Sequence, residues 1–176
     1  MNDQALLSFR VEGREFDTYV HDADGLTTRL QGWMRHVAPM TAKAWARRIR
    51  VVEPDSHPDE YDQHALMGWA DVYVSSESLT DWYCLLRRTQ GDPDAILRAG
   101  VVVQCPPETR PFAQWRYLLD LDQPALEVWS RRAWIHGPAP AFELAGRYCW
   151  ECAGTADLAS LAEAVNLIRL AESEKS

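Results

Sequence analysis

A histidine followed by two aspartates is the clearest catalytic candidate in this sequence. His21, Asp22 and Asp24 come after an expected strand and before an expected helix, a position where loops often carry functional residues. A histidine beside carboxylates could act as a general base, with one aspartate holding its tautomer. The alternative is structural: Asp24 caps the helix and His21 is a satisfied loop residue.

Cys149 and Cys152 form a Cys-x-x-Cys motif. A redox pair usually has its first cysteine at a helix N-terminus, where the helix dipole lowers the pKa of the thiol, but here the next helix is expected only after Gly154. A zinc site needs two further ligands, and Cys84 and Cys105 do not form a second such motif. We therefore expect core cysteines, with a redox or metal role as the open alternative.

An acidic segment with two histidines runs from Glu53 to His64. Carboxylates and imidazoles are metal ligands, but the irregular spacing and the prolines Pro54 and Pro58 match no known metal loop. We expect a solvated loop here and no metal site. Its negative charge could meet a basic partner.

The motifs that identify common enzyme classes are absent from the sequence. It contains no glycine-rich nucleotide loop, no His-Glu-x-x-His zinc motif and no Gly-x-Ser-x-Gly nucleophile motif. We therefore expect no cofactor. The absence lowers the weight of an enzymatic function without excluding it.

The elements that must position these residues begin with a β-hairpin. Leu6–Val11 and Glu15–Val20 flank a turn at Glu12-Gly13-Arg14. An apolar stripe with a 3.6-residue period then predicts a helix over Leu26–Val37. After Pro39 we expect Thr41 to cap a second helix.

The second half of the chain adds a hairpin that pairs Ala113–Asp122 with Ala125–Ser130. Its alternating pattern predicts one buried face of large apolar residues, with Arg116 on the other face; the buried ones are Trp115, Tyr117, Leu119 and Leu121. The remaining expected elements are a helical piece over Tyr61–Met67, strands over Trp69–Val74 and Trp82–Leu86, a helix from Asp92-Pro93 to Gly100, a buried strand over Val101–Gln104, a strand over Arg147–Glu151, and a helix from Ala156 capped by Thr155.

This order of elements shows no regular alternation of strands and helices, which disfavours a doubly wound parallel sheet. We expect a single α+β domain over residues 1–176. An antiparallel sheet is covered by helices on one face, with an N-terminal β-hairpin and a C-terminal amphipathic helix. Residues 172–176 are expected to form a frayed tail.

The opening of the chain resembles a group of small uncharacterised proteins that begin with a strand, a glycine turn, a strand, a Tyr-x-His-x-Asp-Gly segment and a helix. The corresponding residues here are Gly13, Tyr19, His21, Asp24 and Gly25, with one extra residue between the histidine and the aspartate. The segment Tyr117–Asp122 is similar to a later strand of that group. The resemblance covers two short stretches and implies a shared α+β architecture.

The net charge of −8 and the pI near 5.1 disfavour nucleic-acid binding, which needs a basic face. No stretch approaches the roughly 18 apolar residues of a membrane span, and nothing resembles a signal peptide. Eight tryptophans spread through the chain suggest a core built with large aromatics. We therefore expect an acidic cytoplasmic protein with reduced thiols.

The first functional hypothesis is a protein-interaction domain, an immunity-like or regulatory binder of a basic partner protein. The alternative is a small hydrolase- or transferase-like enzyme that uses His21 with Asp22 or Asp24. The sequence gives no oligomeric state.

The cysteine and ligand patterns predict a protein that folds without metal or disulfide. We expect neither EDTA nor dithiothreitol to lower the melting temperature by more than about 5 °C, a shift that corresponds to roughly 1–2 kcal/mol for a chain of this length. Scanning calorimetry with and without each reagent measures this. A larger drop with either reagent would show that a metal or a disulfide holds the fold.

Overall fold

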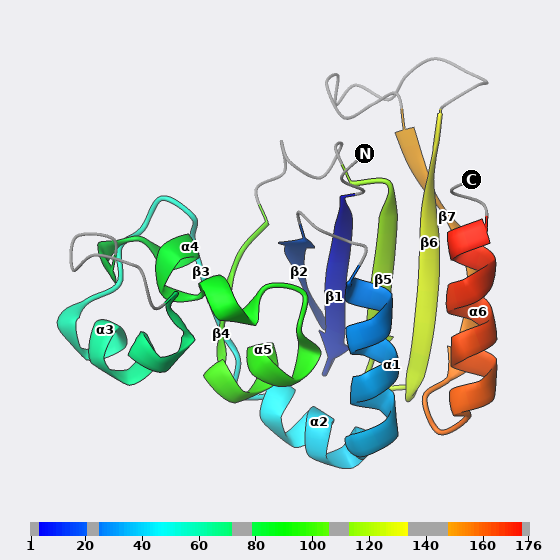
Figure 1. Ribbon diagram of the computed structural model, residues 1–176, viewed down its shortest axis with the longest axis horizontal. Coiled ribbons are helices and arrows are strands. Elements are labelled where there is room, and N and C mark those ends of the chain that lie inside the picture. The colour runs from blue at the N-terminus through cyan, green and yellow to red at the C-terminus, as the bar shows by residue number, and fades with distance from the viewer. Residues whose placement is uncertain (1–3, 21–24, 72–78, 106–112, 134–147, 174–176) are drawn as a thin grey trace.

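The computed structural model describes residues 4–20, 25–71, 79–105, 113–133 and 148–173. These ranges form a mixed structure of helices and strands (Figure 1). The elements in chain order are β1 (Ala5–Val11), β2 (Arg14–Val20), α1 (Leu26–His36), α2 (Pro39–Ala46), β3 (Arg50–Val52), α3 (Glu60–Leu66), η1 (Met67–Trp69), α4 (Trp82–Leu85), η3 (Arg87–Thr89), α5 (Pro93–Ala99), β4 (Val101–Val103), β5 (Trp115–Asp120), β6 (Ala125–Ala133), β7 (Tyr148–Asp157) and α6 (Leu161–Ser173).

The main sheet has five strands in the order β2-β1-β5-β6-β7. Its neighbours pair antiparallel except β1 and β5, which are parallel. A second, two-stranded sheet pairs β3 with β4 in parallel. The fold is therefore α+β with a mostly antiparallel main sheet, as the sequence predicted.

A two-residue turn joins β1 to β2. Glu12 and Gly13 both have positive φ, 52° and 71°, the signature of a type I′ turn that matches the twist of a hairpin. The carboxylate of Asp122 accepts hydrogen bonds from both backbone N–H groups, at 2.9 and 3.0 Å, and pairs with Lys43 at 2.9 Å. The Lys43 ammonium and these two N–H groups hold the pKa of Asp122 well below its usual range.

Helices α1 and α6 lie over one face of the main sheet, and α2 continues that layer (Figure 1). The core lies between this layer and the inward side chains of the strands. It contains the predicted hairpin face, because Trp115, Tyr117, Leu119 and Leu121 are all buried. Within the described ranges, no helix has the length and apolar character that crossing a bilayer would require.

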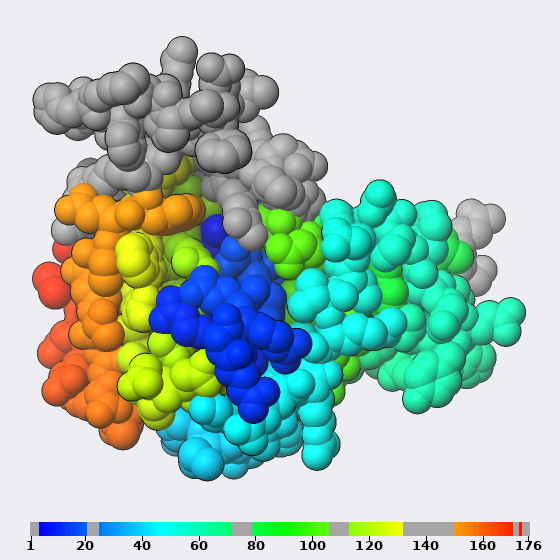
Figure 2. All heavy atoms as spheres, turned by 180° about the vertical axis from the view of Figure 1, so that it is seen from behind, coloured from blue at the N-terminus to red at the C-terminus, as the bar shows by residue number. Residues whose placement is uncertain are grey.

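The opposite face of the sheet, which Figure 2 views from behind, belongs to the strands, and two arginines there bind four carboxylates. Arg10 of β1 reaches Asp120 of β5 at 2.6 Å and Glu127 of β6 at 3.0 Å. It also contacts Glu15 of β2 at 2.6 Å. These contacts connect four neighbouring strands without a covering helix.

Arg116 of β5 makes the second half of this network. It donates to Glu15 at 2.7 Å, to Asp17 at 3.0 Å and to the hydroxyl of Ser8 at 2.9 Å. Ser8 donates in turn to Asp17 at 2.5 Å. Burial by itself would raise the pKa of Glu15, but the hydrogen bonds from Arg116 and Arg10 outweigh it and leave that pKa below its usual value.

The N-terminal hairpin, the Leu26 helix, the helix after Asp92 and the buried strand at Val101 are confirmed within about one residue. The second helix begins at Pro39, so the predicted Thr41 cap is wrong. Proline suits the first helical position, because its missing N–H would have no partner there and its φ is already helical. Ala38 stands at the N-cap.

The strand predicted over Trp82–Leu86 is also wrong. These bulky residues form the short helix α4, because the Asp81 carboxylate accepts from the backbone N–H of Cys84 at 2.9 Å and caps it. Trp69 ends the short helix η1 instead of starting a strand, and positions 72–74 lie outside the described residues.

The C-terminal helix begins at Leu161, not at Ala156, and Thr155 does not cap it. Strand β7 is longer than predicted, because β6 offers it hydrogen-bonding partners as far as Asp157. The Asp157 carboxylate then accepts from the N–H of Ala159 at 2.7 Å in the turn. The helix runs to Ser173, past the expected start of the frayed tail.

Replacing Arg116 tests how much the charge network on the sheet contributes to stability. The sequence pattern suggested an exposed side chain, but it is 15% exposed and faces Asp17, which is 7% exposed. We expect Arg116→Ala to cost about 3 kcal/mol, because it leaves a buried carboxylate without its cation. Urea denaturation measures this free energy of unfolding.

The matched control is Arg47→Ala, which removes the Arg47–Glu12 pair, half exposed on both sides. Its cost should stay below about 1 kcal/mol. Equal costs for the two variants would show that the network on the sheet is no stronger than a surface pair.

Candidate functional site

The predicted catalytic residues His21, Asp22 and Asp24 lie outside the described residues. The first described residue after them, Gly25, stands at the N-cap of α1. The general-base hypothesis and the Asp24 cap therefore both stay predictions.

Cys149 and Cys152 both belong to β7, opposite Arg132 and Trp129 of β6. Cys152 is exposed, which contradicts its prediction as a core cysteine, whereas the same prediction for Cys149 concerns a side chain outside the described part of the structure. Across the described part of the chain, no group of three or more His, Cys, Asp or Glu residues could hold a metal ion.

The acidic segment belongs to a longer stretch of the chain in which the negative charge is concentrated. Residues 51–86, here called the acidic lobe, contain eight Asp or Glu residues and neither Lys nor Arg. They account for the whole net charge of −8, since the rest of the chain holds 18 acidic against 18 basic residues. Figure 1 shows that the described part of the lobe, with α3 and α4, projects from the main sheet beyond β3 and β4.

Helix α3 gives the acidic lobe a fixed shape where the sequence suggested a solvated loop. Asp59 caps the helix by accepting from the N–H of Asp62 at 2.8 Å. Asp62 is buried and pairs with Arg50 of β3, whose guanidinium also lies 5.5 Å from the ring centre of Trp82. The helix Glu60–Leu66 matches the helical piece predicted near Tyr61–Met67.

A small apolar cluster under these contacts forms the interior of the lobe. Its buried members come from β3, α3, α4 and β4, and include Leu66, Trp82 and Leu85. The Trp82 indole donates to the hydroxyl of Ser56 at 3.0 Å. The backbone that carries the acids is therefore held by packing and capping.

The outer surface of the lobe combines negative charge with two large apolar side chains. Tyr61 is 79% exposed and Met67 is 51% exposed. The exposed acids among the described residues of the lobe are Glu53, Asp55, Asp59, Glu60, Asp71 and Asp81. A surface aromatic surrounded by charges of one sign is a common basis for protein recognition.

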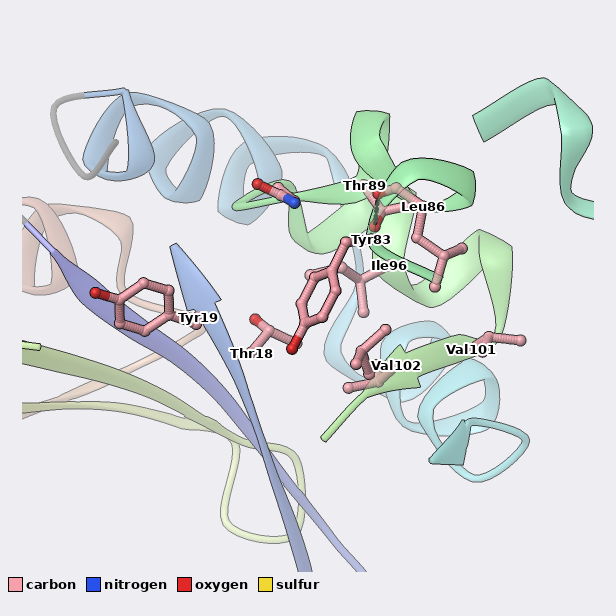
Figure 3. Close-up of a pocket in the computed structure, with 10 residues that line it drawn as sticks. Thr18, Tyr19, Tyr83, Leu86, Thr89, Ile96, Val101 and Val102 are labelled. Atoms are coloured by element: carbon pink, nitrogen blue, oxygen red, sulfur yellow. Dashed lines mark hydrogen bonds between the residues drawn. The ribbon is translucent and has the colours of Figure 1, made fainter. Parts of the chain in front are cut away.

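A small pocket marks the seam between the lobe and the main sheet (Figure 3). Tyr83 extends toward Thr18 of β2, next to Leu86 and Val102, while Tyr19 lies on the other side of the strand. The cavity measures about 40 Å³, a size that suits one or a few waters. Its lining combines residues of β2 with residues of the lobe, so the seam helps to position the lobe against the sheet.

The sequence itself contains the signal for the acidic lobe, because residues 51–86 include eight acidic residues and neither Lys nor Arg. The exposure of Tyr61 has no such signal, since a tyrosine at a helix start is equally compatible with a buried ring. Comparison with known proteins finds no matching family model, curated protein or solved structure.

The cap of α3 tests whether the acidic surface depends on a formed helix. We expect Asp59→Ala to cost about 1 kcal/mol and to speed amide hydrogen exchange in α3. Asp55→Ala removes the same charge from an exposed position, and between Asp55 and the other described residues no side-chain hydrogen bond is seen. Hydrogen-exchange mass spectrometry should show faster exchange in the first variant alone; equal rates would mean that Asp59 contributes charge and no cap.

Proposed function

We propose that this protein is an interaction domain that binds a basic partner protein through the acidic lobe. The observation that carries the proposal is the concentration of the entire net charge on one projecting lobe, next to the exposed Tyr61 and Met67. An immunity-like neutraliser or a regulatory binder of a basic enzyme fits this surface, because both act by covering a partner's charged face.

The physics of association supports an acidic surface of this kind. Charges of one sign on one side of a molecule steer an oppositely charged partner and raise the association rate. A tyrosine adds a large contact area at a low entropic cost, because its side chain has two rotatable angles. The capped helix α3 presents both without a folding step on binding.

The same charge disfavours nucleic acid and anionic membrane surfaces as partners, since both carry negative charge. Among the described residues, Cys84 and Cys152 are free thiols, which suits a reducing compartment such as the cytoplasm. The enzymatic alternative based on His21 stays a prediction.

A direct binding measurement tests the proposal. A partner is first isolated by co-purification from an extract of the native host and then purified. We expect Asp55→Asn/Glu60→Gln to weaken its binding by about tenfold or more, which corresponds to about 1.4 kcal/mol. Tyr61→Ala should give a loss of similar size, as a central aromatic contact would. Titration calorimetry at two salt concentrations measures both, and high salt should weaken the wild type more than the charge variant.

The matched control is Glu151→Gln/Glu163→Gln, which removes two exposed acids from β7 and α6. It changes the net charge by the same amount and should leave the dissociation constant within about twofold. If both double variants lost the same affinity, the net charge of the protein and not the acidic lobe would account for the binding. A partner that binds Asp55→Asn/Glu60→Gln and Tyr61→Ala as tightly as the wild type would overturn the proposal.

A further inference from the structure

A cleft lies between α1, α2 and α5, on the helical side of the molecule and apart from the acidic lobe. Figure 1 shows these three helices next to one another, with α1 in front of the sheet, α5 between it and the lobe, and α2 below both. The cleft has a volume of about 510 Å³, within the range of small-molecule sites. Its main lining side chains are Arg29, Trp33, His36, Trp45, Asp94 and Arg98.

Two indole rings give the cleft aromatic walls. Trp33 of α1 is 5% exposed, and Trp45 of α2 is half-buried. The Arg98 guanidinium of α5 lies over Trp45, 5.7 Å from the ring centre. A planar apolar group would therefore find both a flat surface and a nearby cation.

The carboxylates of the cleft already have partners. Asp92 accepts from the N–H groups of Asp94 and Ala95 as the cap of α5. Asp94 pairs with Nε of Arg98 at 2.8 Å. The guanidinium of Arg98 has four further N–H donors.

The lining has more hydrogen-bond donors than these two carboxylates engage. His36 adds ring nitrogens to the wall beside Arg98, and the buried Nε1 of Trp33 has no hydrogen-bond partner among the described residues. A lining rich in donors, with its carboxylates occupied, complements a ligand that carries acceptor oxygens.

We propose that this cleft binds a small organic anion, an aromatic carboxylate or sulfonate, with its ring between the two tryptophans and its anionic group near Arg98. The site is independent of the acidic lobe. It uses other elements and the opposite ligand charge, so neither proposal depends on the other.

Two fluorescent probes test the class of ligand. 8-Anilinonaphthalene-1-sulfonate carries an aromatic body with a sulfonate, and N-phenyl-1-naphthylamine has the same body without the charge. We expect the sulfonate to bind the folded protein at one site and at least fivefold more tightly than the neutral probe. Arg98→Gln should remove most of that difference while it leaves the neutral probe unchanged. Equal affinities of the two probes for the wild type would overturn the anion assignment.

A glycine in the wall of the cleft tests the location. Gly32 of α1 lines the cleft, and a Cβ there would meet no atom within 4 Å, so Gly32→Leu adds side-chain atoms to the wall from an open position. It also replaces a poor helix former, which favours folding. Gly68 in the acidic lobe has equally open surroundings, and Gly68→Leu is the matched control.

We expect Gly32→Leu to weaken sulfonate binding by at least tenfold and Gly68→Leu to leave it within twofold. Thermal melting confirms that both variants fold. Unchanged binding by folded Gly32→Leu would place the probe elsewhere and overturn the proposal. An equal loss in Gly68→Leu would do the same.

Discussion

The rest of the fold depends on a network of charges on the uncovered face of the main sheet. The helices pack on one face of the sheet. On the other face, side chains of the strands themselves must hold the central strands together. Arg10 of β1 and Arg116 of β5 do this by binding carboxylates on β2, β5 and β6, so that the network links four neighbouring strands. The network also fixes the register, because a slip by one residue between β1 and β5 would turn Arg10 away from Asp120, its partner across the strands.

Asp17 joins this network to the attachment of the acidic lobe. Its carboxylate accepts from Ser8 and Arg116, and its backbone carbonyl accepts from the N–H of Cys105 at 3.2 Å, just after β4. Strand β4 pairs with β3, from which the chain enters the lobe, and Val101 of β4 belongs to the apolar cluster of the lobe. The edge strand β2 is thus linked to the lobe through β4, so the charges on the sheet and the position of the acidic surface are physically connected.

The sequence predicted correctly those helices whose first and last residues are set by capping residues next to them in the chain. Asp92, Pro93 and Gly100 mark α5 with a cap, a first-turn proline and a left-handed end, and the structure has all three. Features that depend on contacts between residues far apart in the chain have no such local signal in the sequence. The alternating pattern placed Arg116 on the face away from the core, yet Arg116 is only 15% exposed. Leu118 and Asp120 on the same face are buried, because the long side chains of the network extend over the sheet. The length of β7 was missed for the same reason, since its last residues are held by β6 and not by their own preference.

The charge of the acidic lobe also follows a physical logic. Like charges in one small segment repel and reduce its stability, and among the described residues of the lobe no Lys or Arg offsets them. Arg50, just outside, neutralises Asp62, the lobe's buried acid, while the described acids that remain face solvent. The apolar cluster around Trp82 then supplies the stability that the exposed charges reduce. A surface that lowers stability and is held in place by its own core is typical of a surface kept for binding.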